Sequence, residues 1–409
     1  MGKLKVFEVV FNDEDPLYRA GDLVSGHVRL LLSEPKDAVR GICIKFKGYS
    51  KTYWKEKETS GVDESERTRS VTYLSKEFYF HEQLIILGKD ETATDGNAAK
   101  IVLHAGEHLF PFSFRIPIKP LPHPFEGFYG QVRYKVTAKI DRPAKSHYKT
   151  QTLFCIIGAG IDLNTKPDSQ IPSIGEDEKS VCCMCCVTGP IKVSAQTNKS
   201  CYVPGEFIWV SGVIQNQSSR EVIDVTAKLV QTVICLARRE VSGRPHTRSQ
   251  VRVISKVKCE GCDEYSKVSF SRKPLLIPSC PPSGLIACGL IDIQYHVKFD
   301  ADIGRTPLDT YIYLPITIGT VPRSSSNAVW SPRNGEVITQ QPSATARQLQ
   351  LVARYESSCE GPQSIPNKYG YTFGKLMFAP KYPMYNFSLP DPDNEPPCTC
   401  RPDQILFNL

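Results

Sequence analysis

The chain of 409 residues lacks several features that define large classes of proteins. No run of 18 uninterrupted apolar residues occurs, so no segment is long enough to span a bilayer as a helix. The N-terminus has no apolar signal region, and we therefore expect a cytosolic protein whose fifteen cysteines are mostly reduced thiols. Nucleophile-elbow, Walker, dinucleotide-binding and kinase motifs are all missing, which favours a non-enzymatic role.

A sustained helical period of apolar residues is missing as well. Thirty-one prolines and 27 glycines instead separate short stretches rich in β-branched and aromatic residues. Within residues 39–53, Ile42, Ile44 and Phe46 alternate with polar or small residues, as in a half-buried strand. Short strands with turn signals about every 8–12 residues predict an all-β fold of antiparallel sandwiches.

One pattern occurs twice. Tyr18-Arg19-Ala20-Gly21-Asp22 and Tyr202-Val203-Pro204-Gly205-Glu206 each place a glycine and an acid after an aromatic residue, and each leads into an apolar stretch. Tyr134-Lys135-Val136 and Tyr295-His296-Val297 repeat a second, shorter pattern downstream. The duplication predicts that one β-sandwich unit is used twice in tandem.

These patterns divide the chain into four parts. We expect a first sandwich over residues 1–160, a cysteine-containing hinge over 161–190, a second sandwich over 191–322 and a flexible tail over 323–409. Ser, Asn, Pro and Gln dominate the tail, a composition typical of disorder. Residues 378–387 are rich in aromatics, which leaves open that this segment docks back on the body.

The ordered set of motifs makes the chain resemble the arrestins, and specifically the α-arrestin branch of arrestin domain-containing proteins. The motifs are Tyr18-x-x-Gly21-Asp22, residues 106–117, Phe125-Glu126-Gly127 before Val132-Arg133-Tyr134, the cysteine run before Gly189-Pro190-Ile191, Tyr202-x-Pro204-Gly205-Glu206, and residues 314–322. The resemblance covers residues 1–322. It implies two tandem, immunoglobulin-like arrestin sandwiches, no catalytic activity and no cofactor.

The resemblance also implies an adaptor that recognises the cytoplasmic tails of membrane-protein cargo. Such an adaptor couples cargo to endocytic sorting, trafficking and ubiquitination, and is recruited from the cytoplasm to the plasma membrane and endosomes. Two alternatives stay open. One is a structural coat-type subunit, like the arrestin-fold member of the retromer, and the other is a redox regulator that binds thioredoxin through a cysteine such as Cys259 or Cys262.

Many α-arrestins recruit HECT-type ubiquitin ligases by offering Pro-Pro-x-Tyr motifs to WW domains. The nearest match here is Ala379-Pro380-Lys381-Tyr382, in which alanine replaces the first proline. Losing one proline ring removes buried apolar area worth roughly 1–2 kcal/mol, or about ten-fold in affinity. Direct ligase binding through Pro380, Lys381 and Tyr382 therefore stays open, as does recruitment through another arrestin.

Basic residues are the candidates for cargo recognition. Residues 324–409 hold seven basic and seven acidic side chains, so the formal charge of +7 lies on the rest of the chain, and a basic body favours anionic partners. In the arrestins, lysines of the first strand and of the N-terminal domain hold phosphates on cargo tails. Ordinary solvent-facing lysines are the alternative, and no aromatic platform supports nucleic-acid binding. The candidate residues are Lys3, Lys5, Lys45, Lys47, Arg133 and Lys135.

The four cysteines Cys182, Cys183, Cys185 and Cys186 have three interpretations. They are small thiols that fill the domain junction, acylation sites that support peripheral membrane association, or zinc ligands shared with Cys259 and Cys262. Their spacing is too tight for one tetrahedral zinc site by themselves. We predict no metal.

The string His104-Ala105-Gly106-Glu107-His108 matches a zinc-protease motif that requires a helix. Gly106 and the alternating aromatic residues that follow predict a strand, which would hold the two histidines too far apart for one metal ion.

Overall fold

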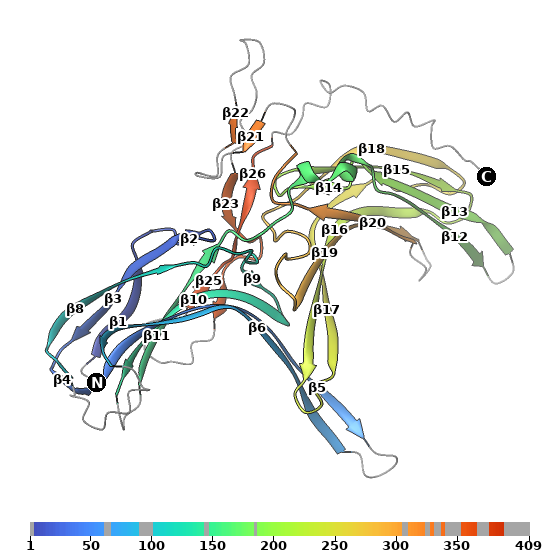
Figure 1. The fold of residues 1–409 in the computed structure, drawn as a ribbon. Helices are drawn as coiled ribbons and strands as arrows, with labels where there is room; N and C mark the ends of the chain where they lie inside the picture. Colours follow the sequence, from blue (N-terminus) through green and yellow to red (C-terminus); the bar gives the residue numbers. More distant parts are fainter. Residues whose placement is uncertain are drawn as a thin grey trace.

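The computed structural model describes residues 4–60, 67–89, 101–142, 147–183, 186–304, 310–323, 328–330, 337–339, 353–365 and 376–387. Strands dominate these residues, and the helices among them are two 3₁₀ turns, η1 (Leu163–Thr165) and η2 (Pro167–Gln170). Figure 1 shows two β-sandwiches side by side, with tail strands between them. In the part of the chain described, no helix has the length and apolar character that a membrane crossing needs.

The first sandwich packs a three-stranded sheet against a larger one. Its core is aromatic: the rings of Phe46 and Phe114 stack at 4.4 Å, and Phe112 meets Phe46 edge-on. The small sheet is β1 (Leu4–Phe11), β3 (Leu23–Leu32) and β8 (Gly106–Arg115); the larger one contains β6 (Arg67–Gly88), β5 (Gly41–Ser60), β10 (Gly130–Asp141), β11 (Tyr148–Ile156), β2 (Leu17–Tyr18) and β9 (Phe125–Glu126), while β4 (Lys36–Val39) pairs with β7 (Ile101–Leu103).

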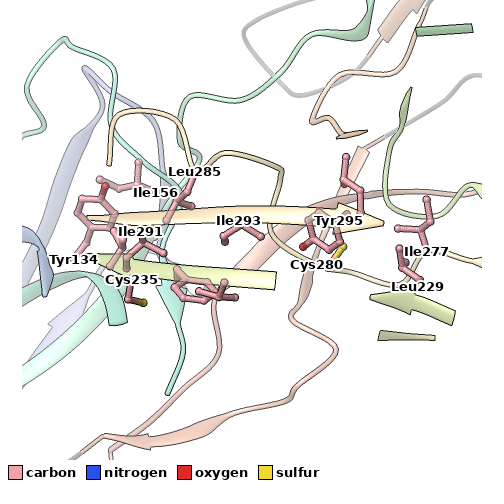
Figure 2. Packing of buried hydrophobic residues seen from close by; sticks show 14 of the residues in the cluster. Tyr134, Ile156, Leu229, Cys235, Ile277, Cys280, Leu285, Ile291, Ile293 and Tyr295 are labelled. Atoms are coloured by element: carbon pink, nitrogen blue, oxygen red, sulfur yellow. The ribbon is translucent and has the colours of Figure 1, made fainter. Parts of the chain in front are cut away.

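The second sandwich repeats this plan, and its core continues that of the first. Figure 2 shows Ile291, Ile293 and Tyr295 in a row along one strand, with Cys235 and Ile291 close to Tyr134 of the first sandwich. One sheet is β12 (Ile174–Cys183), β13 (Cys186–Thr197), β15 (Phe207–Asn216) and β18 (Lys267–Leu276); the facing strands are β14 (Cys201–Tyr202), β20 (Thr310–Ile318), β19 (Ile291–Ile303), β16 (Val222–Arg239) and β17 (Pro245–Cys259).

The predicted duplication is confirmed in detail. In each sandwich the repeated tyrosine ends a two-residue strand that pairs in parallel with a later strand: Tyr18 lies opposite Ile156, and Tyr202 lies opposite Ile318. The glycines of the two turns both have positive φ, +90° at Gly21 and +97° at Gly205, where a side chain would be strained.

The second repeated motif also has the same role twice. The hydroxyl of Tyr134 donates to the carbonyl oxygen of Pro122 at 2.7 Å, and the hydroxyl of Tyr295 donates to that of Pro281 at 2.7 Å. Each tyrosine therefore fixes a proline-rich crossing segment to the central strand of its own sandwich.

A continuous sheet joins the two sandwiches. Strand β16 of the second pairs with β6 of the first, with Arg238 opposite Leu74 and Arg239 opposite Tyr73. The hydroxyl of Thr52 adds a 2.6 Å hydrogen bond to the carbonyl oxygen of Leu236. These bonds connect the β5–β6 hairpin to the β16–β17 hairpin, which project together from the body in Figure 1.

The connection between the sandwiches is shorter than predicted. Residues 174–183 of the predicted hinge belong to β12, which pairs with β13 at the edge of the second sandwich. The intervening segment holds η1 and η2, and Leu163 donates its backbone N–H to the carbonyl of Val321. The polar composition of residues 174–180 suits an exposed edge strand as well as a linker, which is why the sequence did not separate the two.

The predicted flexible tail does not hold for residues 353–365 and 376–387. They form two short antiparallel pairs against the body. Apolar and aromatic side chains, among them Ile365, Phe378, Tyr382 and Tyr385, are buried there, and this burial offsets the entropy of ordering the chain. The pairs are β23 (Ala353–Ser357) with β26 (Lys381–Tyr385) and β24 (Gln363–Ile365) with β25 (Leu376–Phe378); farther upstream, β21 (Ala328–Trp330) pairs with β22 (Val337–Thr339).

Candidate functional site

One face of the large sheet in the first sandwich is basic. On β5, Lys45 and Lys47 alternate with Ile44 and Phe46, which are fully buried in the core. Lys47 lies directly opposite Lys135 of β10, and directly opposite residues of antiparallel strands share a face. Four further basic residues lie near this pair, and the six together define what we call the basic face: Lys45, Lys47, Lys76, His81, Lys135 and Lys149.

The members of the basic face repel one another. Burial, and next the cations of Lys47 and Arg133, lower the pKa of Lys135 to about 8. The pKa of Lys47 is lowered by burial and then by Lys45, Lys76 and Lys149. Burial followed by Lys47 and Lys45 likewise lowers the pKa of His81. A bound anion would relieve this repulsion, so the face has a physical reason to take one up.

Two of the predicted residues stand apart from this face, and a third lies outside the described residues. Arg133 is already occupied, because its guanidinium donates to both carboxylate oxygens of Glu126 at 2.6 and 2.7 Å, and Glu126 is 4% exposed. Lys5 is exposed on β1, in the opposite sheet. Lys3 is the residue outside the described ranges. The structure therefore brings together Lys45, Lys47 and Lys135 and separates them from Lys5.

Lys76, His81 and Lys149 escaped the sequence prediction. Alternation within one strand shows which residues share a face, but it does not show which strands are neighbours. The register of β6 against β5, with a bulge between Gly48 and Tyr49, places His81 opposite Lys47. Only the paired sheet carries that information.

The degenerate ligase motif is inside the protein. Tyr382 is 1% exposed, its hydroxyl donates to the carbonyl oxygen of Pro124 at 3.0 Å, and its ring centroid is 6.2 Å from that of His123. Burial raises the pKa of the Tyr382 phenol well above its usual value. In this conformation a WW domain has no access to the ring, which corrects the expectation of a motif displayed on a flexible tail.

The cysteine cluster is described only in its backbone. Cys182 and Cys183 end β12, Cys186 begins β13, and Cys183 lies opposite Cys186 in the hairpin. Cys185 and the side chains of the other three lie outside the described residues, so the acylation prediction is not tested. Among the described residues no group of three or more side chains could hold a metal ion.

The two other cysteines considered for redox chemistry are buried. Burial raises the pKa of Cys259 to about 11, which disfavours the thiolate that reacts. The Cys262 thiol lies 3.5 Å from the carbonyl oxygen of Ser266. Residues 104–108 enter strand β8 rather than a helix, as predicted.

Two tandem β-sandwiches with a shared sheet and a basic outer face on the first define a two-domain β-sandwich protein. The model of the arrestin (or S-antigen) N-terminal domain matches residues 7–164, and that of the arrestin C-terminal domain matches residues 187–323. The chain belongs to the arrestin family, in the α-arrestin branch of arrestin domain-containing proteins. Family members are generally non-enzymatic adaptors, and an arrestin-family adaptor role is supported for this chain.

The similarity to known relatives extends over most of this chain. It is 30% identical to arrestin domain-containing protein 17 of Caenorhabditis elegans over 342 residues, 82% of this chain and 75% of the relative. It is also 30% identical to arrestin domain-containing protein 4 of Mus musculus over 341 residues, covering 83% and 76%. The identity to arrestin domain-containing protein 1 of Homo sapiens is 29% over 337 residues, covering 82% and 68%.

Proposed function

We propose that this protein is an adaptor that binds acidic or phosphorylated cytoplasmic tails of membrane-protein cargo on its basic face and links them to endocytic sorting. The observation that carries the proposal is the cross-strand pair Lys47–Lys135, set among further cations. Neither lysine has a carboxylate among the groups that shift its pKa. An extended peptide with two or more negative charges would supply a counter-charge to these two lysines.

The proposal includes a link to ubiquitination and a cellular location. The protein would act in the cytoplasm and be recruited to the plasma membrane and endosomes, where its cargo is. Recruitment of a WW-domain HECT ligase would use Pro380, Lys381 and Tyr382 directly, or pass through another arrestin. Acylation of the cysteines in residues 182–186 would strengthen peripheral membrane association.

Charge reversal tests the cargo site. Lys47→Glu with Lys135→Glu should weaken binding of a doubly phosphorylated peptide by at least about ten-fold, because each reversal removes an attraction and adds a repulsion. Fluorescence anisotropy at two salt concentrations measures the affinity and its ionic-strength dependence. Lys267→Glu is the matched control, since Lys267 is an exposed lysine at the start of β18 in the second sandwich.

Equal binding by the double variant, the control and the wild type would remove the basic face from the proposal. Co-purification of the unaltered protein in a stoichiometric complex that ignores peptide phosphorylation would favour the coat-type alternative.

A further inference from the structure

The basic face carries aromatic rings as well as cations. Tyr49 and Phe78 lie directly opposite each other on β5 and β6, with ring centroids 6.3 Å apart, and Phe78 is 55% exposed. The His81 ring stacks on that of Phe78 at 6.2 Å. The ammonium of Lys135 lies 5.6 Å from the centroid of the Tyr49 ring. An exposed apolar surface therefore borders the pair Lys47–Lys135 directly.

These side chains are arranged in rows across the sheet. Residues 46, 48, 50 and 52 of β5 are buried, so residues 45, 47, 49, 51 and 53 line the outer face. Each row is extended by the residue that lies opposite on a neighbouring strand, because opposite residues share a face. We call three of these rows the first cationic row, the aromatic row and the second cationic row. In that order, they are Lys47 with Lys135, Tyr49 with Phe78, and Lys51 with Lys76.

An ion pair keeps the aromatic row neutral. Arg133 lies opposite Tyr49 on β10, which would add a third cation to this part of the face. Its guanidinium is bound to both carboxylate oxygens of Glu126, at 2.6 and 2.7 Å, so its charge is matched within the fold. The outer face therefore presents positive charge, an apolar surface and positive charge again in succession along β5.

The spacing of the rows matches that of an extended peptide. Neighbouring rows are two residues apart on β5, or about 6.7 Å at the usual rise along a strand. An extended peptide that lies along β5 turns every second side chain toward the sheet, at the same spacing. Residues i, i+2 and i+4 of such a peptide therefore reach the three rows in turn. Anions suit the two outer rows, and an aromatic ring suits the middle one.

We propose that the basic face recognises an alternating motif in cargo tails, in which two anionic residues four positions apart flank a central aromatic residue. The phosphates or carboxylates bind the two cationic rows, and the aromatic side chain packs on Phe78 and Tyr49. The cations attract any acidic tail, whereas the aromatic row discriminates among acidic tails, because its contact depends on the position of one ring. The motif rests on the proposed function, since it defines the class of cargo sequence for the same face.

A single-stranded nucleic acid also combines phosphates with flat apolar groups. Proteins that bind it without sequence preference stack successive bases on aromatic side chains. Here the second cationic row lies between the aromatic row and Tyr53, the next exposed ring along β5. The ammonium of Lys51 lies 4.9 Å from the centroid of the Tyr53 ring, so a cation already occupies that ring. One isolated aromatic row favours a peptide with one central ring over a series of bases.

Two peptides of identical composition test the alternating motif. One contains the sequence phosphoserine–glycine–phenylalanine–glycine–phosphoserine, and in the other the phenylalanine changes places with the glycine that follows it. The phosphates stay four positions apart in both peptides, but in the second peptide the ring points away from the sheet. Fluorescence anisotropy with the full chain should show the first peptide binding about three- to ten-fold more tightly.

Substitutions in the rows assign the effect to this face. Phe78→Ala should abolish the preference between the two peptides, because both then lack the ring contact. Phe128→Ala is the matched control and should keep the preference, since Phe128 is 77% exposed in the turn between β9 and β10. Lys51→Glu with Lys76→Glu should weaken the first peptide by about ten-fold, and a singly phosphorylated version by less, because only two phosphates require both cationic rows.

The outcomes separate the motif from the proposed function. If the two peptides bind the wild type equally and Lys47→Glu with Lys135→Glu abolishes binding, the motif is overturned while the proposed function holds. A preference that persists in Phe78→Ala would also overturn the motif, since another surface would then contact the ring. If neither peptide binds, both ideas fail. Tighter binding of single-stranded oligodeoxythymidylate, weakened by Phe78→Ala, would assign the face to nucleic acid and overturn both.

Discussion

Tyr382 donates its hydroxyl proton to the backbone carbonyl of Pro124, 258 positions earlier in the chain, at 3.0 Å. Pro124 ends the proline-rich segment whose Pro122 carbonyl accepts a bond from Tyr134. A tail residue and a core residue therefore fix the same crossing segment from two sides. Removing the tail should therefore destabilise the interior of the first sandwich as well as its surface.

Substituting Tyr382 by phenylalanine should destabilise the protein by about 1–3 kcal/mol, because the Pro124 carbonyl is left buried without its donor. Urea unfolding followed by circular dichroism measures the free energy. Tyr313→Phe is the matched control, since Tyr313 is exposed on β20 and should lose less than about 0.5 kcal/mol. Equal stability of the two variants would contradict the buried bond.

The Arg133–Glu126 pair should behave as a structural contact rather than a cargo contact. Arg133→Ala leaves the carboxylate of Glu126 buried and unpaired, and should cost about 3–5 kcal/mol in stability. Arg133→Met with Glu126→Leu should cost less than the single substitution, because no charge is then left alone. The same urea measurement compares them. A single variant as stable as the wild type would return Arg133 to the candidate cargo residues.

Anion binding should be coupled to a proton near pH 8. Burial, Lys47 and Arg133 lower the pKa of Lys135 to about 8, so the folded protein loses this cation as pH rises through that value. An ordinary lysine stays charged to about pH 10.4. A phosphopeptide favours the protonated form, so binding at pH 8 should take up part of a proton and weaken toward pH 9. Calorimetry in buffers of different ionisation enthalpy measures the uptake.

Lys135→Gln is the control for this titration and should abolish the uptake. The same pKa shift has a consequence for folding. Between about pH 8 and 10.4 the unfolded lysine binds more protons than the folded one, so the stability of the wild type relative to Lys135→Gln should rise with pH over that window. If the stability of the wild type relative to Lys135→Gln falls with pH over this window, the pKa of Lys135 is not lowered by folding.

The two repeated glycines offer an internal comparison. Gly21→Ala and Gly205→Ala both place a side chain at a positive φ, which costs about 1–2 kcal/mol. A Cβ on Gly205 would also overlap the carbonyl oxygen of Tyr385, whereas one on Gly21 meets only Ile118 at 3.4 Å. Gly205→Ala should therefore be the more destabilising and should speed exchange in residues 381–385. Hydrogen exchange and thermal unfolding of both variants measure the difference.

Sequence reasoning succeeded where the signal is local. The alternation of Ile42, Ile44 and Phe46 predicts a strand with one face toward the core, and all three side chains are fully buried. The repeated tyrosine turns predict two equivalent units, and Tyr18 and Tyr202 occupy equivalent strands. In both cases the residues that decide the structure lie within a few positions of each other.

Sequence reasoning failed where the contacting residues are far apart in the chain. The tail is rich in Ser, Pro and Asn, and nothing local shows that Tyr382 meets Pro124 or that Tyr385 meets Thr320. In the sequence, nothing indicates that Arg133 has a partner. In the structure, the short strand β9 pairs with β10 and places Glu126 beside Arg133. Charge at a sequence position predicts a binding residue only after its structural partners are known.

The β6–β16 pairing has a mechanical consequence. The two sandwiches are joined at the paired strands β6 and β16 and again through Tyr382 and Tyr385 of the tail, and both connections restrict rotation of one sandwich against the other. Without the tail contacts, the two sandwiches would still be joined by their continuous core and by the pairing of residues 73–74 with 238–239. The β5–β6 and β16–β17 hairpins meet at this pairing, so we expect them to stay side by side in any change of the angle between the sandwiches.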